Sequence, residues 1–179
     1  MCGGRGTRLD TDAEKPLFRV GGVPMVDRVL DALARSSIDT AYAVTSPAAP
    51  ETRAHLDGPC IETPGEGYVA DLDAALADGR VSTPVLTVAA DLPLLDGAVL
   101  DRALDAHDGG SLSVLVPAAR KRALGVSDDT TFEREGREVA PTGVNVVGET
   151  GEDVWLTDDF RVAVNVNTLA DARVAAEFL

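Results

Sequence analysis

Short apolar runs alternate with amphipathic segments along almost the whole chain. Strands are predicted at 40–46, 60–63, 84–91, 111–117, 142–148 and 161–167. Helices are predicted between them, at 24–35, 50–56, 67–76, 97–107 and 168–179. The helix at 67–76 should bury Val69, Leu72 and Leu76, and Thr168 with Asp171 predicts a capping box at the start of the last helix. The polar stretch 119–139 shows no regular pattern. This alternation is typical of an α/β fold in which helices cover both faces of a mostly parallel sheet. We therefore predict three layers and a single domain over residues 1–179.

Polar segments follow several of the predicted strands. They lie at 45–46, 63–67 and 90–93, and in parallel α/β sheets such segments meet at the ligand-binding edge. The glycine-rich opening, MCGGRGTR, belongs to the same edge if a strand precedes it. We expect that first strand upstream of Met1, as a short segment rich in Val, Ile, Ala and Leu.

The opening loop has the composition of a phosphate-binding loop. Its glycines let backbone N–H groups approach phosphate oxygens closely, and nearby cations supply positive charge. A P-loop is excluded, because the chain contains no G-x-x-x-x-G-K-[ST] run. The dinucleotide fingerprint G-x-G-x-x-G is excluded too, because Leu9 stands where its third glycine belongs.

The remaining pattern, G-G-x-G-T-R followed by K-P-L at 15–17, resembles nucleotidyltransferases with a Rossmann-like domain. That family includes sugar-nucleotide synthases and molybdenum-cofactor guanylyltransferases. Within it, the chain is most similar to the archaeal adenosylcobinamide-phosphate guanylyltransferases. The segments that carry this resemblance cover most of the chain and lie at 44–56, 61–76, 116–129, 140–147 and 164–175.

The sequence departs from the family pattern at a few positions. Cys2 stands where alanine is usual, Arg5 where lysine is common, and Thr142 where alanine is typical. The departures leave the implied reaction unchanged: GMP passes from GTP to adenosylcobinamide phosphate, and pyrophosphate is released. A molybdopterin guanylyl- or cytidylyltransferase remains an alternative, as does a GTP-binding regulator without transferase activity.

The resemblance also implies roles for individual residues. Asp91, which ends the most apolar strand, is the implied Mg²⁺ ligand together with Asn167. The implied catalytic residues are Arg8, Lys15 and Asp91. The residues implied in nucleotide binding are Gly3, Gly4, Arg5, Gly6, Thr7, Thr45, Ser46, Thr63, Gly65, Gly67, Gly143 and Asn145. Asp71 could accept from guanine or stabilise the first turn of its helix.

The charge balance limits the partners of the chain. Its 16 basic and 30 acidic residues give a net charge of −14, which disfavours binding to nucleic acid. Only two of the 16 basic residues are lysines, Lys15 and Lys121, and we interpret this acidic, lysine-poor composition as adaptation to high salt. The two cysteines indicate the cytoplasm, and no run is apolar enough to span a membrane. A homodimer remains open.

Overall fold

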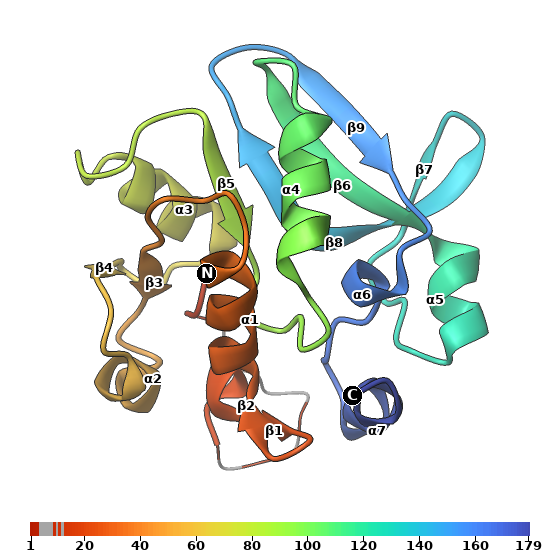
Figure 1. Ribbon diagram of the computed structural model, residues 1–179, viewed down its shortest axis with the longest axis horizontal. Helices are drawn as coiled ribbons and strands as arrows, with labels where there is room; N and C mark the ends of the chain where they lie inside the picture. The colour runs from red at the N-terminus through yellow and green to blue at the C-terminus, as the bar shows by residue number, and fades with distance from the viewer. Residues whose placement is uncertain (4–8, 10, 12) are drawn as a thin grey trace.

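The computed structural model describes residues 1–3, 9, 11 and 13–179 (Figure 1). Its helices are η1 Lys15–Leu17, α1 Met25–Ala34, α2 Pro50–His55, α3 Tyr68–Leu76, α4 Gly97–Asp105, α5 Ala118–Leu124, α6 Phe160–Ala163 and α7 Leu169–Glu177. Its strands are β1 Arg19–Val20, β2 Val23–Pro24, β3 Ala43–Thr45, β4 Cys60–Glu62, β5 Val85–Val88, β6 Ser111–Pro117, β7 Phe132–Arg134, β8 Arg137–Val147 and β9 Glu152–Leu156. The predictions for Gly4, Arg5, Gly6, Thr7 and Arg8 fall outside the described residues.

The main sheet has the order β5-β8-β6-β9, and β7 pairs with β8. Long strand β8 runs antiparallel to its neighbours β5, β6 and β7, while β6 and β9 are parallel. Strands β3 and β4 form a second parallel pair. The predicted α/β class is confirmed, with β8 as an antiparallel element among strands that alternate with helices (Figure 1).

Helices cover both faces of the β3–β4 pair, as burial along β3 shows. Ala43 packs in one cluster with Val26 of α1, whereas the next residue, Val44, packs in another with Ala75 of α3. Successive side chains of a strand point to opposite faces, so α1 and α3 lie on opposite sides of β3. The largest core cluster joins α4 to β5, β6 and β8 through Val99, Val88, Val114 and Val144.

Several segments differ from the sequence-based predictions, among them 152–156, where no strand was predicted and β9 forms. Residues 161–167 were expected to form a strand, but the segment begins with α6 and continues without strand pairing. Asp159 accepts a hydrogen bond from the backbone N–H of Arg161 and so caps α6, while every residue at 162–166 is buried. The stretch 119–139, expected to be irregular, contains most of α5 and all of β7.

The apolar face predicted for the helix at 67–76 is also partly wrong. Val69, expected on the core side, is 70% exposed, whereas Asp71 is buried in the first turn of α3. The helix thus places a carboxylate inside the protein, and its apolar contact with the core comes from Ala75. Among the described helices, none has both the length and the apolarity that a membrane span requires.

The first two residues join β3 to β5. The amino group of Met1 donates to the Val88 carbonyl at 2.8 Å, and Ala90 N–H donates to the Met1 carbonyl at 3.2 Å. On the other side, Cys2 N–H donates to the Val44 carbonyl at 2.7 Å. This is the bonding pattern of a residue placed between two parallel strands. A largely apolar cavity of about 460 Å³ continues from Met1 between β3 and β5, with α1 and α3 lining it.

We expect a short segment of Val, Ile and Ala added before Met1 to fill this cavity and to raise the melting temperature. Burial stabilises by about 1.5–3 kcal/mol for each apolar side chain, and ordering costs about 1–2 kcal/mol for each residue. A net gain of about 2 kcal/mol corresponds to an increase of roughly 4–8 °C in a chain of this size. Calorimetry measures it, with a segment of Gly, Ser and Asp as control. Equal melting temperatures for the two extended proteins would contradict this prediction and would argue against the strand that the sequence analysis expects before Met1.

Candidate active site

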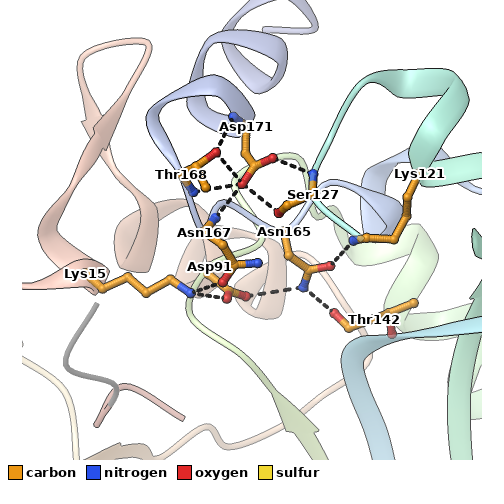
Figure 2. A network of polar contacts seen from close by, with 9 residues as sticks. All are labelled: Lys15, Asp91, Lys121, Ser127, Thr142, Asn165, Asn167, Thr168 and Asp171. Atoms are coloured by element: carbon orange, nitrogen blue, oxygen red, sulfur yellow. Dashed lines mark hydrogen bonds and ion pairs between the residues drawn. The ribbon is translucent and has the colours of Figure 1, made fainter. Parts of the chain in front are cut away.

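A group of polar side chains surrounds Asp91, which lies three residues after the end of β5 (Figure 2). Lys15 Nζ lies 2.6 Å from Asp91 Oδ2 and 2.8 Å from Asn167 Oδ1. Lys15 begins helix η1, and Asn167 lies just before α7, so three distant parts of the chain meet here. The side chains of Lys15 and Asp91 are each 17% exposed, which keeps their ion pair partly shielded from water. The sequence-predicted residues Lys15, Asp91 and Asn167 are thus in direct contact.

Asn165 links this group to a second lysine. Its Nδ2 donates to the Thr142 carbonyl at 2.8 Å and to Asp91 Oδ1 at 3.4 Å, and its Oδ1 accepts from Lys121 Nζ at 3.0 Å. Lys121 also donates to the Ala163 carbonyl at 2.8 Å. These contacts fix the orientation of the Asn165 amide. Burial of the Lys121 ammonium lowers its pKa, although nearby carboxylates, Asp171 first among them, act in the opposite direction.

Asp171 holds the segment that carries the two asparagines. Its Oδ2 accepts from the backbone N–H groups of Asn167 and Thr168 at 3.0 and 2.8 Å, and Thr168 Oγ1 completes the predicted capping box. Ser127 donates to the same carboxylate through both its N–H and its hydroxyl. Burial alone would raise the pKa of Asp171, but hydrogen bonds, led by that of Ser127, lower it overall. The carboxylate therefore stays charged and keeps Asn167 next to Asp91.

The donors around Lys15 suit a magnesium ion. One Asp91 carboxylate oxygen and the Asn167 amide oxygen both accept from the Lys15 ammonium, so the two oxygens face one position that a cation occupies. Mg²⁺ commonly takes one or two protein oxygens and completes its shell with water and substrate phosphates. The described residues contain no group of three or more His, Cys, Asp or Glu side chains that could hold a metal. Residues 91 and 167 therefore fit a magnesium ion shared with phosphate oxygens.

The described end of the glycine loop packs tightly against Ser46, and Ser46 also packs against Gly65 in the loop before α3. A Cβ atom on Gly3 would lie 3.1 Å from Ser46 Oγ, and one on Gly65 would lie 3.1 Å from Ser46 Cβ. Ser46 Oγ donates to the Gly3 carbonyl at 3.3 Å. Asp71 Oδ1 accepts from Gly65 N–H at 2.7 Å, so this carboxylate organises the loop before α3. The predicted nucleotide residues Gly3, Ser46 and Gly65 are thus brought together.

Three other residues predicted to bind the nucleotide, Thr45, Thr63 and Gly67, have structural roles in this region. Thr63 Oγ1 donates to the Thr45 carbonyl at 3.0 Å, and the two residues are 4% and 1% exposed. The Thr63 side chain therefore connects the chain that follows β4 to the backbone of β3. Gly67 precedes α3 with a φ of 117°, a conformation that favours glycine. The nucleotide-binding roles of these three residues stay predictions.

A cavity of about 320 Å³ opens beside Asp91. Its lining includes Gly143 and Asn145 of β8, both predicted for the site, and also Lys121 and Asn167. Gly143 has a φ of 82°, and a Cβ atom there would lie 2.7 Å from that of Ala89. Glycine at this position lets β8 approach the end of β5 closely, and Ala89 N–H donates to the Gly143 carbonyl at 2.8 Å.

Several residues of the network were not among those predicted from sequence. Thr142, Ser127 and Asp171 are common residue types whose positions depend on the tertiary fold, and Asp171 was expected only to cap α7. Lys121 had a usable signal, because it is one of only two lysines beside fourteen arginines. Both lysines reach the same network (Figure 2).

Similarity to known proteins covers the whole chain. The chain is 28% identical to the adenosylcobinamide-phosphate guanylyltransferase of Methanocaldococcus jannaschii over 199 aligned positions, with 100% of this chain and 95% of that protein covered. It is 26% identical to the bifunctional protein GlmU of Streptomyces griseus, over 94% of this chain and 35% of that protein.

Solved structures support the same fold. A Bacillus anthracis protein assigned as a glucose-1-phosphate thymidylyltransferase superposes with a TM-score of 0.70 at 13% identity, over 99% of this chain and 92% of that one. This likeness concerns the fold alone. The sequence model of the MobA-like NTP transferase domain matches residues 1–168. The chain therefore belongs to the family of MobA-like NTP transferase domains and is a nucleotidyltransferase.

Proposed function

We propose that the protein transfers GMP from GTP to adenosylcobinamide phosphate and releases pyrophosphate. The full-length similarity to the Methanocaldococcus jannaschii enzyme supports this choice of substrates. The observation that carries the proposal is the contact of Lys15, Asp91 and Asn167 next to the described end of the glycine-rich loop. This arrangement combines a cation for phosphate oxygens with oxygen ligands for a metal.

The chemistry requires positioning and charge neutralisation more than proton transfer. An oxygen of the acceptor phosphate attacks the α-phosphorus, a new P–O bond forms, and the bond to pyrophosphate breaks. The acceptor oxygen is already anionic, so a strong general base is not needed. His55 pairs with Asp27, and His107 contacts the Gly110 carbonyl, which places neither histidine in the network around Asp91.

Asp91 and Asn167 would hold Mg²⁺, which supplies charge neutralisation at the phosphates when it is bound. In the structure the Lys15 ammonium lies between these two oxygens, and it would supply a second positive charge to the phosphates beside the ion. Asn165 supports Asp91 from the side of Thr142. Asp171 holds the backbone of Asn167 in place. Asp91 and Asn167, the two proposed metal ligands, are thus each held in place by a neighbouring side chain.

The two alternatives differ in what they require of this site. A molybdopterin guanylyl- or cytidylyltransferase would use the same donor site and differ in its acceptor. A GTP-binding regulator without transferase activity would have little use for an acid placed between two lysines, and membership of a transferase family also disfavours it. Transfer assays with molybdopterin and with adenosylcobinamide phosphate as acceptors distinguish the molybdopterin transferase from the proposed function.

We expect GTP to bind more tightly than ATP, CTP or UTP. The loops at 45–46 and 63–67 pack against each other through Ser46 and Gly65, and Ser46 contacts Gly3, so we infer that their polar groups recognise the edge of a guanine base. Competition against a fluorescent GTP analogue measures the four affinities in one format. Tighter binding of ATP or CTP would contradict guanine as the preferred base, and a CTP preference would favour the molybdopterin cytidylyltransferase alternative.

The proposal also covers the cofactor, the cellular compartment and the salt concentration in which the enzyme works. Mg²⁺ is the proposed cofactor. Two free thiols, Cys2 and Cys60, support a reducing cytoplasm, and the net charge of −14 supports a working environment of high salt. A homodimer remains open.

A further inference from the structure

Nothing in the proposed mechanism so far uses Lys121, although it is the second lysine of the network. The residue is only 4% exposed, and it lines the 320 Å³ cavity beside Asp91. Placing an ammonium group in such a site is costly unless a partner compensates for the lost hydration. A charged group retained in a cavity next to the reaction centre therefore suggests an anionic ligand.

The hydrogen bonds of Lys121 leave room for such a ligand. An ammonium group carries three N–H donors. Within the described part of the chain, two hydrogen bonds are made by Nζ, to the Ala163 carbonyl and to Asn165 Oδ1. Both acceptors are uncharged, so among the described residues the ammonium makes no hydrogen bond to a carboxylate. Counted over the same residues, one donor is left for a group in the cavity.

The two lysines flank the same acid. Figure 2 shows Lys15 and Lys121 pointing toward the network from different sides, with Asp91, Asn165 and Asn167 between them. Lys15 comes from η1, which follows the glycine loop, whereas Lys121 comes from α5, which follows β6. Transfer to a phosphate brings two anionic groups to one phosphorus, the polyphosphate of the donor and the phosphate of the acceptor. They lie on opposite sides of it during an in-line displacement.

We propose that Lys121 binds the phosphate of the acceptor, a phosphomonoester, within the cavity lined by Gly143 and Asn145. Lys15 then serves the donor nucleotide and Lys121 the acceptor. The inference rests on the proposed function only in taking the acceptor to be a phosphomonoester. It does not depend on which alcohol carries the phosphate. One oxygen of that phosphate attacks the α-phosphorus, pyrophosphate leaves with the electrons of the broken P–O bond, and no proton is transferred.

The first test uses methyl phosphate as the probe and a non-hydrolysable α,β-methylene analogue of GTP to fill the donor site. Phosphorus NMR titration gives the dissociation constant of methyl phosphate for the wild type and for Lys121→Met. We expect at least a tenfold weakening in the variant, equal to about 1.4 kcal/mol or more. Arg122→Met is the matched control, because it removes an exposed cation from the same helix.

Loss of the hydrogen bonds to Ala163 and Asn165 could itself disturb the site in Lys121→Met. Lys121→Gln removes the charge but retains N–H donors for these acceptors on a side chain that is one atom shorter, so it should weaken methyl phosphate binding as well. Affinity for the GTP analogue should stay unchanged in both variants. Equal weakening of nucleotide and methyl phosphate would show a structural role and overturn the proposal, as would unchanged binding of methyl phosphate.

A second measurement separates this inference from the choice of substrate. Adenosylcobinamide and adenosylcobinamide phosphate differ by the phosphate alone, so the ratio of their affinities reports its contribution. That ratio should fall toward one in Lys121→Gln. If the wild type binds neither compound but binds methyl phosphate through Lys121, the cobinamide substrate is wrong and the phosphate site stands. If the ratio is the same in wild type and variant, the phosphate site is wrong.

Discussion

Replacing Asp91 by asparagine is expected to lower turnover by roughly 10²–10³-fold, the usual scale for removing one group that stabilises a transition state. The amide keeps the size of the side chain but removes the charge that pairs with Lys15 and that would hold Mg²⁺ with Asn167. Because the reaction depends on neutralised phosphates, the loss should appear in the turnover number. The release of pyrophosphate at saturating substrates measures it.

Binding of GTP separates this effect from general damage to the site. The affinity of Asp91→Asn for GTP should stay within about threefold of the wild type, well below the 1.4 kcal/mol of a tenfold change. Asp105→Asn is a suitable control, because it makes the same chemical change at an exposed position at the end of α4. Normal turnover of Asp91→Asn at saturating Mg²⁺ would remove Asp91 from the active site.

Replacing Lys15 by methionine should reduce kcat/KM by a comparable factor, roughly 10²–10³. Methionine keeps much of the length of the side chain but cannot donate to Asp91 or Asn167, and it brings no charge to the phosphates. Unlike Asp91→Asn, this variant should also bind GTP more weakly, because Lys15 follows the loop that is predicted to hold the triphosphate. Steady-state kinetics and equilibrium binding of GTP measure the two effects.

Two further variants make the result specific. Arg19→Met removes an exposed cation close to Lys15 in sequence and should leave kcat/KM near the wild-type value. Lys15→Arg keeps the charge but replaces a compact ammonium by a planar group, so it should restore only part of the activity. If Lys15→Met and Arg19→Met behave alike, the effect is one of overall charge and Lys15 has no role at the phosphates.

Much of the architecture was predictable, because long periodic segments determine most of the elements. The alternation of strands and helices gave the α/β class, and Thr168 with Asp171 predicted the capping box at the start of α7. The error at 161–167 has a local cause. The sequence RVAVNVN alternates between apolar and polar residues, which is typical of a strand with one buried and one exposed face. In the structure, residues 162–166 are all buried after the α6 cap, so the alternation does not indicate a strand here.

The candidate site was predictable where its residues stand in the glycine-loop motif or at the end of an apolar strand. Lys15 and Asp91 were found in this way, and the structure brings them into contact. Lys121 and Thr142 were not found, because their place beside Asn165 depends on how α5 and β8 pack against the chain that follows α6. Contacts of this kind join positions far apart in sequence, and periodicity does not encode them.

The proposed transfer of GMP is tested most directly by identifying the product formed from GTP and adenosylcobinamide phosphate in the presence of Mg²⁺. Mass spectrometry of the corrinoid, together with an assay of pyrophosphate, follows both halves of the reaction. We expect adenosylcobinamide-GDP and pyrophosphate in equal amounts. Release of inorganic phosphate and GDP, or transfer to molybdopterin with none to adenosylcobinamide phosphate, would contradict it.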